Sequence, residues 1–398
     1  MTSQPSKTKI HPGIRTMRIL YFVYFAANGI FFTYINVYYQ SLGLSGTQIG
    51  FVNTLSPLTA ILGMILWGVL NDRFARTRLL LSLSIAGAAL SALALSTAQS
   101  FAVIVPLACT FSLLANPIIP LLDSTTLGLL GEQAHTYGRQ RVWGSVGFIV
   151  TTASVGFLLD LVGLHGMFLS FALVMGVMLL VSTRLPAQPV HLGSFTLTGL
   201  NKMLRHPSWL IFTASVFLLG LSFTGIFNFI GVTMRLMGAT DSLIGLAWTM
   251  AAVSEIPVMF FSAHLLRRFT ATRLVAVAFG MYMLRCALYA IMPSPAWVLG
   301  IHLIFGAGFG LYWVGAVAYL SDIAPAGLTT TAQSLLTSTT GMANVLGALI
   351  CGWLFDRVGP SGLYQILTVV SLMAFLLFAG GQVALRRQQP QVMTESSS

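Results

Sequence analysis

Charged residues are scarce in this sequence. They make up 7% of the chain, whereas an ordinary soluble domain carries about 25%. Hydrophobic residues account for 56%, so the composition excludes a typical water-soluble domain and predicts a membrane protein. The few charges are mostly basic, with a formal net charge of +11. In an apolar chain this excess needs no nucleic-acid partner, because basic loops also set membrane topology.

The motifs of common ATPase and enzyme sites are also missing. The sequence contains no G-x-x-x-x-G-K-[ST] loop, no H-E-x-x-H and no nucleophile elbow, so we expect neither direct ATP coupling nor an enzyme. Three cysteines lie in apolar runs without paired spacing, which predicts small buried residues rather than disulfides or metal ligands. We expect no metal and no cofactor.

Long apolar runs dominate what remains. A helix needs roughly 20 apolar residues to cross the hydrocarbon core, and backbone in that region must be helical or form a closed barrel. Twelve runs qualify, so the sequence predicts an all-α membrane protein of twelve transmembrane helices. They cover roughly residues 17–40, 47–70, 78–98, 101–127, 140–159, 163–183, 208–233, 241–264, 273–292, 296–320, 329–354 and 361–384.

Two pairs of segments recur at nearly the same shift. GVLNDRFARTRL (68–79) aligns with AHLLRRFTATRL (263–274) at a shift of 195, and GFLLDLVGLHGMF (156–168) aligns with GWLFDRVGPSGLY (352–364) at a shift of 196. The repeat predicts two pseudo-symmetric six-helix halves, as in many secondary transporters. The expected parts are a tail (1–16), a first half (17–183), a central loop (184–207), a second half (208–384) and a second tail (385–398).

Lys and Arg predict the orientation. Sixteen of the twenty basic residues lie in the tails and in the loops on the side of the termini, and only two lie in the opposite loops. Because basic loops remain cytoplasmic, we expect both termini in the cytoplasm and a multi-pass protein of a bacterial inner membrane.

The loop after the second run carries a motif. Residues 68–78 read G-x-x-x-D-R-x-x-R-x-R, with Gly68, Asp72, Arg73 and Arg76. Together with twelve runs in two halves, it resembles the major facilitator superfamily over the whole chain. The resemblance implies a gating latch in which Asp72 caps a helix or pairs with arginines; the alternative is a basic turn that only sets topology. In the second copy, Arg267 replaces Asp72.

Four ionisable residues lie within the runs: Asp123, Arg141, Glu255 and Arg285. Such residues are costly in a membrane and by default indicate a functional site; the alternative is an ion pair that only joins helices. Asp123 and Arg141 are eighteen residues apart on consecutive runs. We therefore expect them at similar depth and within side-chain reach.

A narrower resemblance follows from the same region. P-x-x-D at 120–123 and Y-G-x-x-R-x-W-G-S-x-G-F at 137–148 resemble the phenylpropionic acid permease group, which is related to the lactose permease and the nucleoside–proton symporters. The resemblance implies that Asp123 and Arg141 hold the substrate. It places Glu255 and Arg285 in the proton machinery, where Asp123 and His302 are further candidates. His302 is also open to the interpretation of a packed helix histidine.

Aromatic and polar residues at helical spacing add candidates for the binding cavity. For any one of them, helix packing is the competing interpretation. The predicted substrate-binding residues beyond Asp123 and Arg141 are Phe25, Asn28, Phe32, Asn116, Trp313, Thr337 and Asn344. The run Gly306-Ala-Gly308-Phe-Gly310 follows no strand and predicts close helix packing rather than a dinucleotide site.

These features predict a secondary active transporter. We expect proton-coupled symport of a small organic solute, such as an aromatic carboxylate, by alternating access about a midplane site. A sugar or nucleoside–proton symporter is the alternative, because the same groups can stack on rings and bond hydroxyls. A drug–proton exporter is disfavoured since residues 140–159 lack proline, and a non-transporting membrane sensor is the rival outside transport. The expected partners are the solute, protons and the bilayer, for a monomer that binds no nucleic acid.

Overall fold

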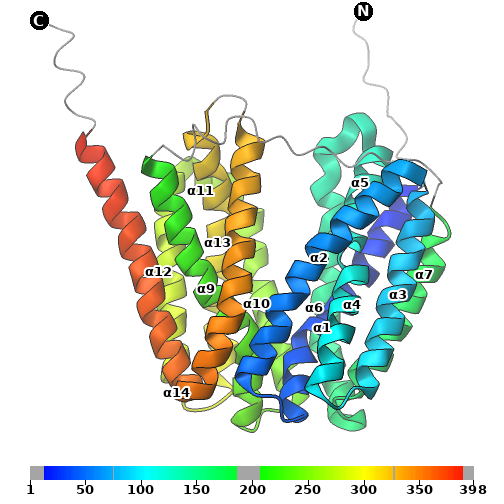
Figure 1. Cartoon of the computed structure of the whole chain (residues 1–398). Coiled ribbons are helices and arrows are strands. Elements are labelled where there is room, and N and C mark those ends of the chain that lie inside the picture. The colour runs from blue at the N-terminus through cyan, green and yellow to red at the C-terminus, as the bar shows by residue number, and fades with distance from the viewer. Residues whose placement is uncertain (1–12, 75, 186–206, 326–327, 389–398) are drawn as a thin grey trace, which may run out of the picture. The chain divides into compact units, whose positions relative to one another are not determined.

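The chain folds into helices joined by short turns (Figure 1). The computed structural model describes residues 13–74, 76–185, 207–325 and 328–388. In chain order the helices are α1 (Gly13–Ser41), α2 (Gly46–Phe74), α3 (Thr77–Thr97), α4 (Phe101–Ala115), α5 (Ile118–Leu130), the 3₁₀ helix η1 (Gly131–Thr136), α6 (Tyr137–Val162), α7 (Gly166–Ser182), α9 (Pro207–Leu236), α10 (Asp241–Phe260), α11 (Ser262–Arg268), α12 (Ala271–Ala290), α13 (Trp297–Ile323) and α14 (Thr329–Gln388).

Ten helices within the described ranges are long and apolar enough to cross a membrane. The 60-residue α14 covers two predicted runs, because Gly359 leaves the helical conformation with φ 70° and Pro360 follows it. The shorter apolar helix α7 covers the sixth predicted run. The predicted fold class, an all-α membrane protein with twelve crossing helices, is confirmed.

Two predicted runs are interrupted in the structure. Run 101–127 divides into α4 and α5, because Pro117 cannot donate a backbone hydrogen bond and the chain turns at Asn116–Pro117. Run 241–264 divides at Phe261, four residues after Pro257, and continues as the separate helix α11. The first break lies seven residues before Asp123, so it sets how α5 presents that side chain.

The chain forms two compact units. The first holds residues up to Tyr34 and from Ser56 through α7, and the second holds residues 35–55 together with α9 to α14. The division at 17–183 and 208–384 stays a prediction. Most of the predicted tails and central loop lies outside the described residues.

In the second unit α14 packs along α9 and α12, and α13 packs against α10 and α12. Its core is aromatic and includes Phe212, Phe279 and Phe378. A Cβ added to Gly306 would lie 2.0 Å from the Ala251 carbonyl oxygen. The glycine therefore permits close contact between α10 and α13, which confirms the packing interpretation of the glycine run.

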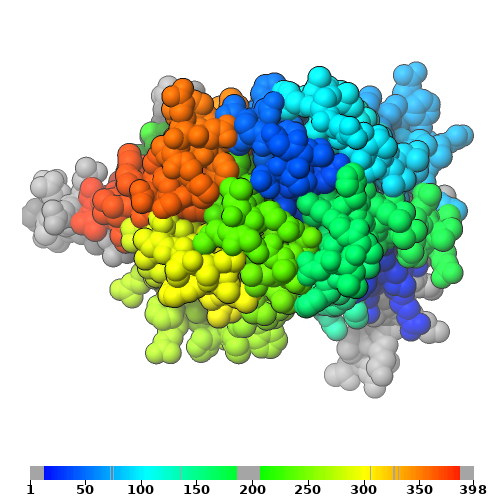
Figure 2. Space-filling model, turned by 90° about the horizontal axis from the view of Figure 1, so that it is seen from below, coloured from blue at the N-terminus to red at the C-terminus, as the bar shows by residue number. Residues whose placement is uncertain are grey.

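The start of α2 contacts the middle of α14 within the second unit, as Figure 2 shows where blue atoms meet orange ones. The backbone N–H groups of Gly46 and Thr47 donate to the Asp356 carboxylate at 2.6 and 2.7 Å. This carboxylate thus caps the first turn of α2, where an anion is favoured. A Cβ on Gly50 would lie 2.3 Å from the Ala348 carbonyl oxygen, so the two helices touch through their backbones.

Candidate functional site

Asp123 on α5 and Arg141 on α6 form an ion pair in the first unit. Arg141 Nε lies 3.9 Å from Asp123 Oδ1, and the two side chains are 35% and 29% exposed. The predicted proximity of these residues is therefore observed. The partial exposure leaves both charged groups able to meet a solute.

A tyrosine from α1 completes the surroundings of Asp123. The Tyr21 hydroxyl donates to Asp123 Oδ1 at 2.7 Å and lies 3.1 Å from Thr126 Oγ1. Tyr137, at the start of α6, also interacts with this carboxylate. Sequence reasoning did not assign Tyr21, Thr126 or Tyr137 to the site. For Thr126 and Tyr137 the available signal was spacing, since Thr126 follows Asp123 by three residues and Tyr137 precedes Arg141 by four.

The Arg141 guanidinium also faces an aromatic ring. Its Cζ lies 4.5 Å from the centroid of Phe25, within the range of a cation–π contact. The contact depends on glycine, because a Cβ on Gly144 would lie 2.5 Å from Phe25 Cδ2. A Cβ on Gly147 would lie 2.1 Å from the Phe22 carbonyl oxygen. The close crossing of α1 and α6 thus brings Phe25 onto Arg141.

Three other predicted binding residues of the first unit make local contacts. Asn28 Nδ2 donates to the Tyr24 carbonyl oxygen at 2.8 Å, and Asn116 Nδ2 donates to the Ser112 carbonyl oxygen at 2.9 Å. Phe32 is 41% exposed. The hydrogen bonds of Asn28 and Asn116 stabilise their own helix segments, so their binding roles remain predictions.

The other three predicted binding residues, Trp313, Thr337 and Asn344, lie in the second unit and make different contacts. The Trp313 ring lies 6.2 Å from that of Phe309. Thr337 Oγ1 donates to its own helix, while Asn344 Oδ1 accepts a 2.7 Å hydrogen bond from the Thr224 hydroxyl on α9. Asn344 is therefore partly committed to joining α14 to α9.

Glu255 and Arg285 lie in the second unit near a tyrosine. Arg285 is fully buried on α12, with its Cζ 4.1 Å from the Tyr282 ring centroid. Tyr282 interacts electrostatically with both Arg285 and Glu255. Glu255 is partly buried on α10 next to α13, where a Cβ on Gly310 would lie 3.5 Å from Glu255 Cγ. Tyr282 is thus a further residue that sequence reasoning missed.

His302 is packed and hydrogen-bonded inside the second unit. Its Nδ1 lies 2.6 Å from the Ala247 carbonyl oxygen, and because a carbonyl only accepts, Nδ1 carries a proton. The ring lies 5.5 Å from Trp248 and 6.2 Å from Tyr289, and the residue is 1% exposed. This geometry favours the interpretation of a packed helix histidine over that of a proton carrier.

The predicted gating residues lie at the end of α2 and the start of α3. Gly68 and Arg73 belong to α2, and Arg76 precedes α3 without a side-chain capping bond. Arg73 is exposed, with its Cζ 5.7 Å from the Phe74 ring. The side chain of Asp72 lies outside the described residues, so the latch remains a prediction.

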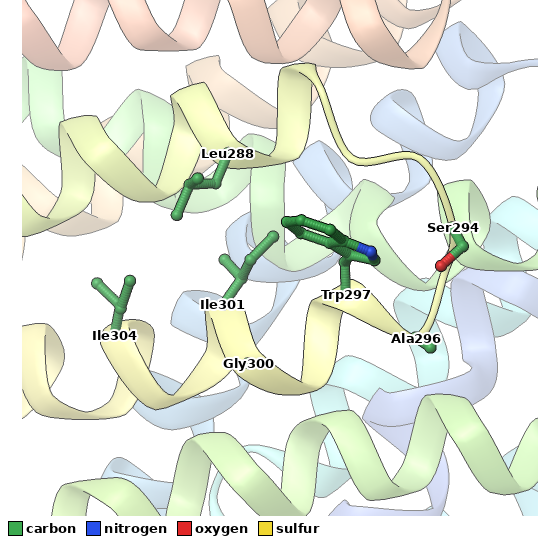
Figure 3. Close-up of a pocket in the computed structure, with 7 residues that line it drawn as sticks. All are labelled: Leu288, Ser294, Ala296, Trp297, Gly300, Ile301 and Ile304. Atoms are coloured by element: carbon green, nitrogen blue, oxygen red, sulfur yellow. The ribbon is translucent and has the colours of Figure 1, made fainter.

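A separate cavity lies where α12 ends and α13 begins (Figure 3). Its volume is about 520 Å³, and its lining includes Leu288, Trp297, Ile301 and Ile304. No ionisable group and none of the predicted site residues lines it. Within the described residues, no three His, Cys, Asp or Glu side chains form a group that could hold a metal ion.

Comparisons with known proteins agree with this architecture. The family model described as the MFS_1 like family matches residues 14–366. The maltose permease of Geobacillus stearothermophilus is 30% identical over 370 residues, which cover 91% of this chain and 93% of that protein. A probable 3-phenylpropionic acid transporter of Escherichia coli (strain K12) is 23% identical over 372 residues, with 91% and 96% covered.

Among solved structures, the nucleoside transporter NupG matches with a TM-score of 0.80 at 18% identity, covering 94% of this chain and 99% of that chain. A bacterial homologue of the lysosomal transporter Spinster matches with a TM-score of 0.70 at 15% identity, covering 97% and 98%. At these identities the likeness concerns the fold. The family match and the permease relative carry the assignment: this chain belongs to the MFS_1-like family and is a multi-pass membrane transporter of the major facilitator superfamily, not an enzyme.

Proposed function

We propose that this protein is a proton-coupled symporter that takes up a small neutral solute bearing hydroxyl groups on a ring, such as a sugar or a nucleoside. The observation that carries the proposal is the partly exposed Asp123–Arg141 pair, with Tyr21 on the carboxylate and Phe25 on the guanidinium. An arginine fork and a carboxylate together offer donors and acceptors to vicinal hydroxyls, and aromatic faces pack against a ring.

The charges of Asp123 and Arg141 favour a neutral solute over an anionic one. Arg141 already lies beside Asp123, so an anionic solute would have to compete with a carboxylate held in place by the Tyr21 hydroxyl. A neutral solute meets no such competition. This order reverses the one expected from sequence, and the relative named as a maltose permease supports it. The aromatic carboxylate is the second candidate, supported by the relative named as a probable 3-phenylpropionic acid transporter.

Proton coupling is assigned to Glu255 in the second unit. Glu255 is partly buried, and removal from water favours the neutral form of a carboxyl group. Arg285 is its cationic neighbour through Tyr282, which interacts with both. In this scheme Glu255 takes up a proton with the solute, and the approach of Arg285 favours release of the proton after the conformational change. His302 takes no part in this scheme, because its ring is buried and packs against Trp248 and Tyr289.

The proposal includes the orientation of the chain in the membrane and its oligomeric state. Both termini face the cytoplasm of a bacterial inner membrane, since sixteen of twenty basic residues lie on that side. The chain works as a monomer, and its two halves, 17–183 and 208–384, alternate access to a midplane site. Gly68, Asp72, Arg73 and Arg76 form the cytoplasmic gate.

Uptake by the purified protein in liposomes tests the proposal. The panel is radiolabelled maltose, uridine and 3-phenylpropionate, each with an imposed inward proton gradient and with the gradient collapsed by a protonophore. We expect a neutral hydroxylated solute to accumulate only with the gradient. Arg141→Lys should lose most of this uptake, because lysine keeps the charge but not the planar fork. Accumulation of 3-phenylpropionate alone would move the assignment to the carboxylate, and accumulation without a proton gradient would remove proton coupling.

A further inference from the structure

The end of the second unit at α11 carries positive charge that the proposed transport site does not use. In the second copy of the loop motif Arg267 stands at the position of Asp72 in the first copy, and residues 256–321 contain no acidic residue. The exposed basic side chains of this segment are Arg267, Arg268 and Arg273.

Arg268 lies near an exposed aromatic ring, with its Cζ 5.9 Å from the Phe269 ring centroid, and further exposed rings precede α11. Helix α11 contains no buried residue, and Phe260 at the end of α10 is 79% exposed. Phe261 and Phe269, at either end of α11, are 56% and 40% exposed. We call the six side chains the Arg–Phe patch: Phe260, Phe261, Arg267, Arg268, Phe269 and Arg273.

The turn between α11 and α12 holds the arginines on one short stretch. Phe269 is extended, and the Thr270 hydroxyl accepts from the Arg273 backbone N–H at 3.3 Å, which fixes the start of α12. Arg267 and Arg268 thus precede a two-residue turn and Arg273 follows it closely. The ion pairs Asp123–Arg141 and Arg235–Asp241 lie elsewhere in the described part of the chain, and neither involves a residue of the patch.

The patch lies at one end of the membrane-crossing helices. Figure 1 shows α11 at the end of the second unit where α9 begins and α14 finishes. Aromatic rings are enriched where a bilayer meets water, and basic side chains at that level attract anionic headgroups. A guanidinium matches phosphate oxygens with two parallel hydrogen bonds.

We propose that the Arg–Phe patch binds the headgroup of an anionic phospholipid in the adjoining leaflet. The arginines hold the phosphate, and the exposed phenylalanine rings rest among the upper parts of the acyl chains. The first copy of the loop differs, because Asp72 offsets part of its charge and α2 continues through that segment to Phe74 without a separate exposed helix. The proposal concerns a lipid site and stands apart from the identity of the transported solute.

Lipid titration of the purified full-length chain tests the site. Native mass spectrometry in detergent would measure the affinity for the first bound phosphatidylglycerol, with phosphatidylcholine as the neutral probe. Each arginine near a membrane surface contributes roughly a fivefold gain in affinity for anionic lipid. We therefore expect R267Q/R268Q/R273Q to lose roughly 100-fold in phosphatidylglycerol affinity and to bind phosphatidylcholine like the wild type.

The matched control removes three arginines from the first copy, R73Q/R76Q/R78Q, and should lose much less. Arg267→Asp restores the acid of the first copy and tests the site if the triple variant does not fold. Size-exclusion profiles and thermal unfolding report folding for every variant. Equal losses in both triple variants would mean a diffuse attraction of basic loops, and unchanged affinity in the second-copy variants would mean no site; either result overturns the proposal.

Discussion

The Phe25–Arg141 contact gives the sharpest prediction, because one glycine controls it. A Cβ at position 144 would lie 2.5 Å from Phe25 Cδ2 and 3.0 Å from Cε2. Both distances involve a ring, which cannot yield as the end of a flexible chain would. Gly144→Ala should therefore push Phe25 away from the guanidinium without touching Arg141 or Asp123.

The expected loss follows from the contact that is removed. A cation–π contact contributes about 0.5–1 kcal/mol at exposed sites and about 2 kcal/mol when desolvated. Arg141 is 35% exposed in its side chain, which places the contact between these limits. We expect solute affinity to fall by roughly three- to thirtyfold, measured as binding of the solute that the uptake panel identifies. Phe25→Leu should lower the affinity by a similar amount, because it keeps an apolar side chain and removes the ring face.

The double variant distinguishes displacement of the ring from a general distortion of α6. If the methyl group added by Gly144→Ala acts through Phe25, combining this substitution with Phe25→Leu should cost little further affinity, whereas independent effects would add. Gly176→Ala on α7 is the matched control, because a Cβ there meets no atom within 4 Å. Wild-type affinity in folded Gly144→Ala protein would refute the reasoning, as would full additivity with Phe25→Leu.

Three further predictions concern the other groups. Tyr21→Phe removes the 2.7 Å hydrogen bond to Asp123 and should lower solute affinity about tenfold, while Phe retains the ring; unchanged affinity would exclude a positioning role. Glu255→Gln should abolish accumulation driven by a proton gradient but preserve solute exchange in liposomes, and surviving accumulation would reassign the proton. Asp356→Asn weakens the cap on α2 and should raise labelling of a single cysteine at position 53 by an impermeant maleimide roughly fivefold. Equal labelling with and without this substitution would show that the cap does not hold α2 against α14.

The sequence was most informative for features that depend on the spacing of residues along the chain. Composition and the length of the apolar runs predict the membrane-crossing helices, because backbone polar groups in the hydrocarbon core must be hydrogen-bonded within a helix or a closed barrel. Asp123 and Arg141 were expected at the same depth because they lie eighteen residues apart on consecutive runs, and they meet at 3.9 Å. Both predictions depend on residues that are close to one another in the sequence.

Contacts between distant segments could not be predicted in the same way. Tyr21 reaches Asp123 across 102 positions of sequence, and no spacing rule relates α1 to α5. The contact depends on how closely α1 and α6 cross, which Gly147 permits. Likewise, His302 is a polar residue within an apolar run. Its partner, the Ala247 carbonyl oxygen 2.6 Å from Nδ1, lies on another helix and could not be predicted from the sequence.

Helix α1 links two features that the sequence treated separately. It is continuous from Gly13 to Ser41, and its earlier turns carry Tyr21 and Phe25 against the Asp123–Arg141 pair. Its residues from Ile35 onward, with the start of α2, belong to the second compact unit, where the Asp356 carboxylate caps α2. A continuous hydrogen-bonded helix resists bending at any one residue. A solute that repositions Phe25 therefore acts on α1, the helix that also holds the Tyr21 hydroxyl against Asp123.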